Sequence, residues 1–254
     1  MLRPHSDLQP FLDRLTSRSV LTQPEQQAIL DLPRHVEQVR SNRDFVRLGE
    51  RVHHSCFVAD GIVGGFGQNA SGGRQITSFF IPGDMADLQS VVQPGPTTAL
   101  QALSVATILK IPHAAIRAVA ARYPAVAAAF WRDCMVDTAV LAQWVVNIGR
   151  RDARERIAHL LCEAAVRFKA APAKGDVVFP FAVTQLQMAD ATGLTPVHVN
   201  RTIMALRKEE LVTIRGHTVW IHDWEALTEV ADFDPEYLQI EVRPEQRIRI
   251  AEAC

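Results

Sequence analysis

The sequence predicts an α+β fold in three consecutive parts: an N-terminal antiparallel β-barrel of the jelly-roll type, one long helix, and a smaller C-terminal domain. Three observations predict it. Short apolar runs separated by glycines fill residues 45–111, apolar residues then recur at helical spacing, and capped helical segments alternate with short strand-like runs towards the C-terminus. We expect the domain boundaries at 1–123, 124–150 and 151–254.

Length and composition limit the class of protein. At 254 residues, 48% hydrophobic and 22% charged, the chain is long enough for two domains with buried cores. A formal net charge of −1 excludes a uniformly basic surface, so any contact with a polyanion must be concentrated in one place. The cysteines form no CxxC pair, and neither a secretory signal nor a membrane-crossing apolar stretch occurs. We therefore expect a cytoplasmic protein without membrane contact.

The N-terminal part should begin with two short helices and continue as strands. Apolar residues within 8–15 fall on one helical face, and Pro24 suits the first turn of a second helix that ends near Leu30. Residues 57–63 and 76–81 have the composition of strands. Many short strands with close turn signals are typical of a small antiparallel barrel or sandwich.

A long helix should open at Pro124 and run to about Gly149, where a small charged hinge, 149–152, precedes the second domain. Along this helix the spacing of apolar residues alternates between three and four, as in a two-stranded coiled coil. A helix packed on its own domain could show the same short pattern, and we favour a homodimer. The predicted dimer seam consists of Trp131, Cys134, Thr138, Leu141, Val145 and Ile148.

The segment that begins at Thr184 carries the most specific pattern in the chain. Thr184 stands at the N-cap of a first helix, Ala189 is small enough for a second helix to cross closely, and Gly193 supplies a positive φ. Thr195 then caps the second helix, and Pro196 occupies its first position, where a missing N–H costs nothing. This order of cap, turn glycine and second cap predicts a helix-turn-helix.

The second helix has an outward face suited to DNA. Val199, Ile203 and Leu206 should face inward, and the acids nearest to the helix are Asp190 before it and Glu209 after it. In the major groove arginine pairs with guanine and asparagine with adenine. An ordinary helical hairpin with a solvated face is the plainer alternative. The predicted DNA-contacting residues are Thr184, Thr195, Pro196, Val197, His198, Asn200, Arg201 and Lys208.

Two runs further along, 211–214 and 218–222, are joined by Arg215-Gly216-His217 and are typical of a β-hairpin. A third run, 177–181, can add a strand. A hairpin in this position makes the C-terminal domain a winged helix-turn-helix. The pattern predicts sequence-specific binding to double-stranded DNA through a recognition helix at about 195–208.

With these motifs the sequence resembles the Crp/Fnr family of bacterial transcription regulators. Residues 154–161 look like the start of the family's DNA-binding domain, and 189–203 look like its helix-turn-helix. Gly49-Glu50, 58–61 and 81–84 resemble its cyclic-nucleotide-binding-type barrel. The resemblance implies a homodimer that binds a two-fold symmetric operator and contacts RNA polymerase, and it implies no enzymatic activity.

The resemblance also assigns roles within the recognition helix. Arg201 falls on the arginine with which the family reads a guanine. Val197 stands where the family usually has a glutamate. A valine accepts no hydrogen bond from cytosine, although it can touch a thymine methyl, so the operator need not be the usual one.

Cyclic nucleotide binding in this family depends on an arginine that neutralises the phosphate. Here no arginine occurs between Arg74 and Arg117, and Pro96 stands near the expected place. Asp84 and Thr97 could imitate the rest of the phosphate cassette, but an acid without a base repels a phosphate. We therefore expect no control by cAMP and predict no cofactor. Candidate residues for an effector of unknown identity are Gly83, Asp84, Thr97, Thr98 and Leu141.

Other interpretations of the N-terminal domain stay open. His53, His54 and Cys56 could serve a haem or metal sensor, but neighbours on a strand point to opposite faces, so the histidines could share a metal only in a loop. An iron–sulfur cluster needs about four cysteine ligands, and those here lie in separate elements. A cupin-like barrel enzyme needs histidines and a carboxylate at one metal, and no HxH spacing occurs. We predict no metal site; a regulator without any ligand, controlled by its own abundance, is a further interpretation.

Overall fold

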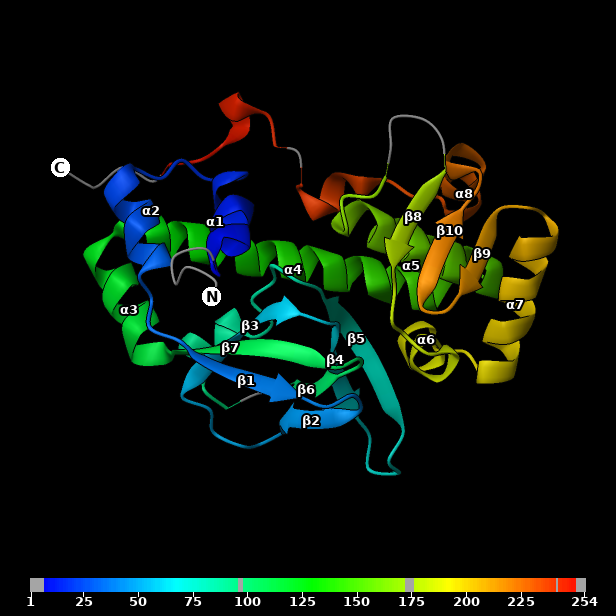
Figure 1. Cartoon of the computed structure of the whole chain (residues 1–254), viewed down its shortest axis with the longest axis horizontal. Helices are drawn as coiled ribbons and strands as arrows, with labels where there is room; N and C mark the ends of the chain where they lie inside the picture. Colours follow the sequence, from blue (N-terminus) through cyan, green and yellow to red (C-terminus); the bar gives the residue numbers. More distant parts are fainter. Residues whose placement is uncertain (1–6, 96–97, 172–175, 241, 250–254) are drawn as a thin grey trace. The chain divides into compact units, whose positions relative to one another are not determined.

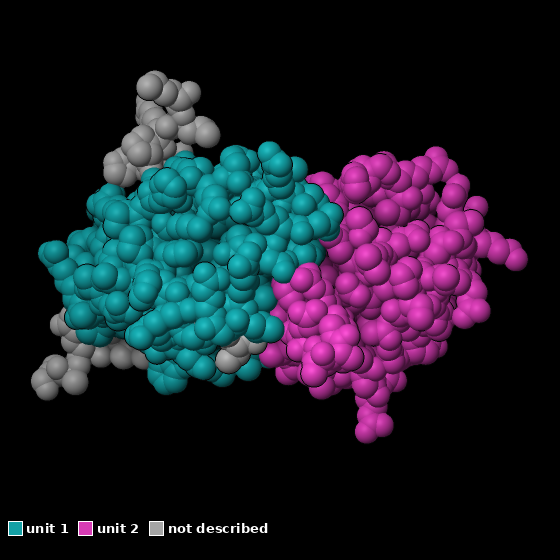
Figure 2. All heavy atoms as spheres, turned by 90° about the horizontal axis from the view of Figure 1, so that it is seen from below, with its two compact units in different colours: residues 1–65, 80–138, 239–254 teal, residues 66–79, 139–238 magenta. Residues whose placement is uncertain are grey.

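The computed structural model describes residues 7–95, 98–171, 176–240 and 242–249 (Figure 1). The chain divides into two compact units, which are coloured separately in Figure 2. Unit 1 comprises residues 1–65, 80–138 and 239–254, and unit 2 comprises residues 66–79 and 139–238. Each unit therefore combines segments that lie far apart in the sequence. Within the described residues no helix is long and apolar enough to span a membrane.

Unit 1 begins with the two predicted helices, α1 (Gln9–Thr16) and α2 (Gln23–Leu30), and both are confirmed. The apolar face of α1 is buried. Phe11 contributes most to this packing, because its ring stacks on that of Phe130 at 6.0 Å and meets that of Phe57 edge-on at 6.3 Å. A core of unit 1 therefore joins an N-terminal helix, a strand and the long helix.

Two sheets follow in the first half of the chain, and in the described residues they form the antiparallel, jelly-roll-like fold that the sequence predicted, with the barrel not closed. The first has the order β1-β7-β3 and the second the order β2-β6-β4-β5. The strands are β1 (His35–Val39), β2 (Arg43–Val46), β3 (His54–Asp60), β4 (Val63–Gln68), β5 (Arg74–Phe80), β6 (Ala99–Ala102) and β7 (Ala106–Pro112). A short 3-10 helix, η1 (Leu88–Val91), lies between β5 and β6.

The strand predicted over 57–63 is wrong at its centre, because the chain turns at Gly61. Gly61 has a φ of +83°, and a Cβ atom there would lie 2.3 Å from the carbonyl oxygen of Val105. Only glycine fits such a position. β3 therefore ends at Asp60, and β4 begins at Val63. The strands begin soon after the second helix, since β1 pairs antiparallel with β7.

Two helices connect the sheets to the rest of the chain: α3 (His113–Arg122) and α4 (Pro124–Arg150). The predicted long helix is therefore confirmed. Tyr123, between the two helices, has extended backbone angles, as a residue before proline prefers. α4 continues past Gly149 into the predicted hinge. Only Arg151 and Asp152 separate it from α5 (Ala153–Arg167), whose first N–H groups are capped by the Asp152 carboxylate.

Unit 2 contains the predicted helix-turn-helix and its wing. After α5 come β8 (Val177–Pro180), α6 (Gln185–Thr192), α7 (Pro196–Lys208), β9 (Val212–Arg215), β10 (Thr218–Ile221), α8 (Trp224–Ala231) and a 3-10 helix, η2 (Pro235–Leu238). β8, β10 and β9 form one antiparallel sheet in that order. The predicted strand and hairpin are confirmed.

The hairpin of 66–79 belongs to unit 2 through specific contacts. The ring of Phe79 meets Trp144 edge-on at 5.3 Å and Phe181 at 5.8 Å. The Gln75 side chain donates to the carbonyl oxygen of Ala191, at the end of α6, over 3.0 Å. A hairpin formed by the end of β4 and most of β5 is thereby fixed to the helix-turn-helix.

Unit 1 is completed by the C-terminal segment, which we define as residues 239–249. Its 3-10 helix η3 (Pro244–Gln246) precedes Ile248, whose carbonyl oxygen accepts from the Val20 N–H at 3.2 Å. The Arg249 guanidinium donates to both carboxylate oxygens of Glu25, at 2.9 and 3.1 Å. The C-terminal segment is thus bound to residues in and just before α2.

Candidate nucleic-acid interface

The first helix of the motif, α6, begins as predicted. The Thr184 hydroxyl accepts from the Gln187 N–H at 3.2 Å, and the Oε1 atom of Gln187 accepts from the Thr184 N–H at 2.8 Å. This reciprocal capping box satisfies two N–H groups that a helix start leaves free. Gly193 ends the helix in the left-handed conformation, with a φ of +66°. Ala189 is almost completely buried, as a close helix crossing requires.

The second helix, α7, is fixed in the same way. The Thr195 hydroxyl accepts from the His198 N–H at 3.2 Å, and Pro196 occupies the first helical position. The three residues predicted to face inward are buried: Val199, Ile203 and Leu206. The sequence therefore predicted correctly which face of the recognition helix packs on unit 2.

The opposite face of α7 is open. Val197 is 79% exposed, and Asn200, Arg201 and Lys208 are exposed along the same side, whereas His198 is half-buried. Thr184, Thr195 and Pro196 are exposed at the starts of the two helices. All eight predicted residues therefore lie in one helix-turn-helix. Their contact with DNA stays a prediction.

Two further residues belong to this face, and the sequence analysis missed both. Met204 is 53% exposed between Arg201 and Lys208. Gln185, at the first position of α6, donates from Nε2 to the Oδ1 atom of Asn200 over 3.1 Å. The place of Gln185 directly after the Thr184 cap could have indicated an exposed side chain at the start of α6. Its contact with Asn200 depends on how α6 and α7 cross, which the sequence does not show.

The motif is held to the rest of unit 2 by charged side chains. The Arg156 guanidinium of α5 donates to the Thr192 carbonyl oxygen at 3.0 Å, which satisfies the end of α6. Burial raises the pKa of Asp190, and the nearby Arg74 guanidinium acts in the opposite direction. Asp190, in the first helix of the motif, is half-buried and is thus set back from the exposed face.

The predicted dimer seam follows an exposed face of α4. Trp131, Leu141 and Val145 are 65%, 43% and 65% exposed, and Thr138 is exposed between them. Cys134 and Ile148 are half-buried. Met135, which the sequence analysis did not include, is 54% exposed on the same helix. Contiguous apolar exposure of this kind marks an interaction surface.

Asp84, a candidate effector residue, is engaged within unit 1. Its carboxylate forms an ion pair with the Arg14 guanidinium of α1 and accepts from the Ile81 N–H at 2.8 Å. Arg14 also binds Asp133 at 2.6 Å and Asp137 at 2.7 Å, both on α4. We expected Asp84 to lack a basic partner. Arg14, 70 residues earlier in the chain, is that partner.

The other effector candidates differ in their exposure within the described residues. Gly83 is buried at a turn with a φ of +104°, and Thr98 is half-buried. Leu141 lies on the exposed face of α4. Thr97, with Pro96, lies outside the described residues. The effector pocket stays a prediction.

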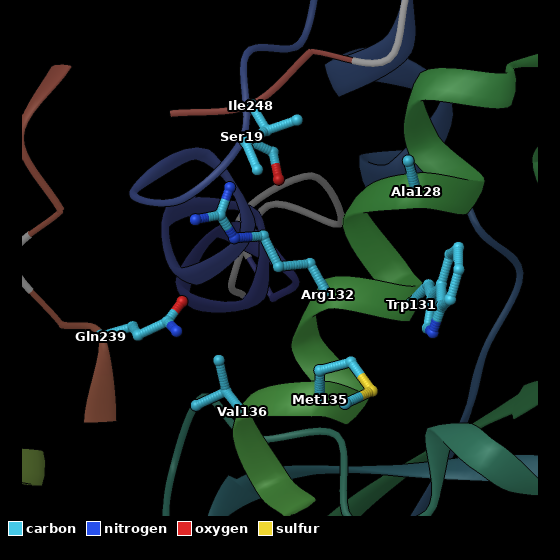
Figure 3. A pocket seen from close by; sticks show the side chains of 8 residues that line it. All are labelled: Ser19, Ala128, Trp131, Arg132, Met135, Val136, Gln239 and Ile248. Atoms are coloured by element: carbon cyan, nitrogen blue, oxygen red, sulfur yellow. The ribbon is translucent and has the colours of Figure 1, made fainter. Parts of the chain in front are cut away.

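A pocket of about 410 Å³ lies elsewhere in unit 1, and none of the effector candidates lines it (Figure 3). Arg132 extends from α4 towards Ser19, and its Nη1 atom donates to the carbonyl oxygen of Arg18 at 2.7 Å. Gln239 reaches in from the C-terminal segment. The lining residues are Ser19, Ala128, Trp131, Arg132, Met135, Val136, Gln239 and Ile248.

The histidine and cysteine cluster lies at the start of β3. Cys56 is completely buried, and burial raises the pKa of its thiol. His54 is half-buried, and burial lowers the pKa of its imidazole. Among the described residues no group of three or more His, Cys, Asp or Glu side chains could hold a metal. No observation in this part of the chain favours the haem or metal sensor.

Comparison with known families identifies the family of this chain. A cyclic nucleotide-binding domain model matches residues 36–123, and a Crp-like helix-turn-helix domain model matches residues 155–230. Together they cover more than half of the chain. The chain belongs to the Crp/Fnr family. It is therefore a DNA-binding transcription regulator of the Crp/Fnr type.

Individual relatives agree with this assignment. This Crp/Fnr chain is 24% identical over 219 residues to the transcriptional activator protein FnrL of Cereibacter sphaeroides, across 84% of this chain and 86% of that protein. It is 22% identical over 190 residues to the regulatory protein HlyX of Actinobacillus pleuropneumoniae, across 75% and 79% of the two chains. Its fold is similar to that of FixK2 from Bradyrhizobium japonicum, with a TM-score of 0.71 and 22% identity over 78% of this chain and 98% of that one.

Proposed function

We propose that this Crp/Fnr regulator acts as a cytoplasmic homodimer that binds a palindromic operator through α7, contacts RNA polymerase and is not controlled by cAMP. In this proposal residues 1–123 respond to a signal, 124–150 join two copies, and 151–254 bind DNA. The protein regulates transcription and catalyses no reaction. The observation that carries the proposal is the outward face of α7, which is exposed, free of acids and carries Asn200, Arg201 and Lys208.

The positions along α7 suggest a division of roles. Arg201 lies in the middle of the exposed face, where its guanidinium can pair with O6 and N7 of guanine. Val197, one turn earlier, can touch a thymine methyl. Lys208 is in the last turn, where a cation also interacts favourably with the helix dipole and can lie over a phosphate. Two copies of α7 in a symmetric dimer call for half-sites about one helical turn apart.

The test is a binding selection from random DNA duplexes with the wild type and three variants. Arg201→Ala should cost about 1–3 kcal/mol at the selected site and relax the preference at one base pair per half-site. Lys208→Ala should weaken binding to all sequences alike and reduce the salt slope by about one per subunit. Val197→Glu should move the preference towards cytosine at the facing position. If Arg201→Ala keeps the wild-type motif and Lys208→Ala changes it, the assignment of the base-reading face is wrong.

Independence from cAMP rests on two observations. The arginine that the family uses for the phosphate is absent from the sequence between Arg74 and Arg117. The Asp84 carboxylate is already engaged by the Arg14 guanidinium and by the Ile81 N–H. Isothermal titration with millimolar cAMP should therefore give no binding heat and no gain in DNA affinity. A micromolar dissociation constant for cAMP would contradict this part of the proposal.

A further inference from the structure

One hydrogen bond crosses between the two helices of the motif on its exposed side. The Nε2 atom of Gln185 donates to the Oδ1 atom of Asn200 over 3.1 Å. Gln185 is the first residue of α6, and Asn200 is the fifth residue of α7, one turn before Met204. Both side chains are exposed. The bond therefore forms on the face that the proposed function assigns to DNA.

The backbones at both ends of this bond are fixed. Gln185 directly follows Thr184, whose capping box sets the start of α6. Asn200 directly follows Val199, which is completely buried beneath α7. The distance that the Gln185 side chain spans is thus set by the crossing of α6 and α7.

The bond determines which way the Asn200 amide faces. The acceptor oxygen and the donor nitrogen of an amide lie in one plane and point in different directions from the amide carbon. Because Oδ1 accepts from Gln185, the Nδ2 group is turned away from Gln185 with its N–H donors available. In the major groove this donor can meet N7 of a purine or O4 of thymine, whereas cytosine presents only its own N4 donor.

We propose that Gln185 is a positioning residue that orients Asn200 and thereby sets the base preference at one base pair of each half-site. This inference rests on the proposed function. Asn200 makes the base contact by donating from Nδ2, and adenine is the preferred base because its N6 group can also donate to the second lone pair of Oδ1. Cytosine is rejected at that position because two donors would face each other.

The experiment compares four variants with the wild type in the same selection from random duplexes: Gln185→Met, Gln185→Glu, Asn200→Ala and the double variant Gln185→Met/Asn200→Ala. Methionine keeps the length of glutamine but cannot donate. Gln185→Met should therefore reduce the preference for adenine at one base pair by at least about fivefold, with the Arg201 base pair unchanged. Thermal unfolding should be close to that of the wild type, since the replaced side chain is exposed.

Gln185→Glu gives the sharper result. A carboxylate only accepts hydrogen bonds, so Asn200 must turn its Nδ2 group towards residue 185 and its Oδ1 atom towards the DNA. The preference at this base pair should then move from adenine to cytosine, whose N4 group donates. The added charge should weaken binding to all sequences, which does not change the order of preference among bases. A role of Gln185 in stability alone would not exchange one base for another.

The double variant tests whether Gln185 acts through Asn200. In the Asn200→Ala background, Gln185→Met should change neither the selected motif nor the affinity, because its target is gone. If it weakens binding there as much as in the wild type, Gln185 contacts DNA by itself and the inference is wrong. An unchanged motif in Gln185→Glu would also overturn it while leaving the proposed function in place. A wild type that selects no motif at all would overturn the proposed function and this inference together.

Discussion

Asp87 shows how one buried acid in unit 1 responds to its surroundings. Its carboxylate is 5% exposed and accepts from the Cys56 N–H at 2.6 Å. The Ser90 hydroxyl lies 3.4 Å from the same carboxylate and 2.8 Å from Nε2 of His113. Burial outweighs these hydrogen bonds and raises the pKa of Asp87 from its ordinary 3.8 to about 6. Asp87 therefore binds its proton more tightly in the folded state than in the unfolded chain.

The sign of the resulting pH dependence follows from this shift. Because the pKa is higher in the folded state, the stability that protonated Asp87 contributes is fully present below about pH 4 and is lost as the pH rises through about 6. Asp87→Asn keeps an acceptor for the Cys56 N–H and cannot ionise. Relative to the wild type, this variant should gain about 3 kcal/mol of unfolding free energy between about pH 4 and pH 7.

Urea denaturation at several pH values, with wild type and Asp87→Asn measured side by side, checks the prediction. Other titrating groups cancel in the difference between the two proteins. One of them is His159, whose pKa burial lowers to about 4, so that its contribution to stability is lost in acid instead. A difference that does not vary with pH would show that Asp87 does not titrate in this range.

At the scale of an element, α4 has apolar residues on a face that the described part of the chain leaves exposed. Trp131, Met135 and Val145 are each more than half exposed. Other faces of the helix are packed, for example through Val126 and Trp144, which are buried. A second copy of α4 on the exposed face would remove the apolar side chains from water, and we therefore expect the dimer there.

Leu141→Asp tests this interface. Leu141 is 43% exposed in the single chain, so an aspartate should not disturb the fold of the chain itself. In the dimer the same aspartate would be an unpaired charge in an apolar contact, at a cost of several kcal/mol. Sedimentation should show a monomer. Val92→Asp is the matched control, because Val92 is 84% exposed and lies outside α4. An intact Leu141→Asp dimer would remove the seam from the proposed interface.

At the scale of the whole molecule, the C-terminal segment belongs to the same unit as the N-terminal helices. The chain leaves unit 2 at Leu238 and completes unit 1 with the C-terminal segment. Arg18 is the centre of this attachment: its guanidinium donates to the Gln239 carbonyl oxygen at 2.9 Å and binds Asp133 of α4 at 2.7 Å. Arg249 adds an ion pair with Glu25, and its hydrogen bonds lower the pKa of that carboxyl to about 2.

A double-mutant cycle measures this attachment. Glu25→Gln and Arg249→Met should each destabilise the protein at neutral pH, and the coupling between them should be about 1 kcal/mol, since Arg249 is partly exposed. The coupling should be present above the ordinary pKa of 4.5 and should fade as the pH falls towards about 2, because the folded pKa of Glu25 is depressed.

Chemical denaturation of the four proteins gives the coupling directly. Arg247→Met is the control within the C-terminal segment, because Arg247 is exposed and two residues from the ion pair. It should change stability by only a few tenths of a kcal/mol. A coupling indistinguishable from zero would show that the C-terminal segment is not held by Glu25 in solution.

The helix-turn-helix could be predicted from the sequence because its signals are local. Thr184, Gly193 and Thr195 each act on backbone groups within a few residues, so their chemistry is the same in any tertiary context. The length of α4 followed from Pro124 and from the helical spacing of apolar residues. The domain types and the recognition helix were therefore determined by the sequence alone.

The remaining features depend on residues that only the folded chain brings together. Gly61 makes a turn because its backbone approaches Val105, which no local pattern shows. Asp84 pairs with Arg14 of α1, and Gln185 meets Asn200 across two helices. The hairpin of 66–79 joins unit 2 through Phe79 and Gln75. Each of these contacts joins residues from different segments of the chain, at least 15 positions apart in the sequence, so packing decides it. Caps and periodicity, in contrast, are decided within a few turns of one element.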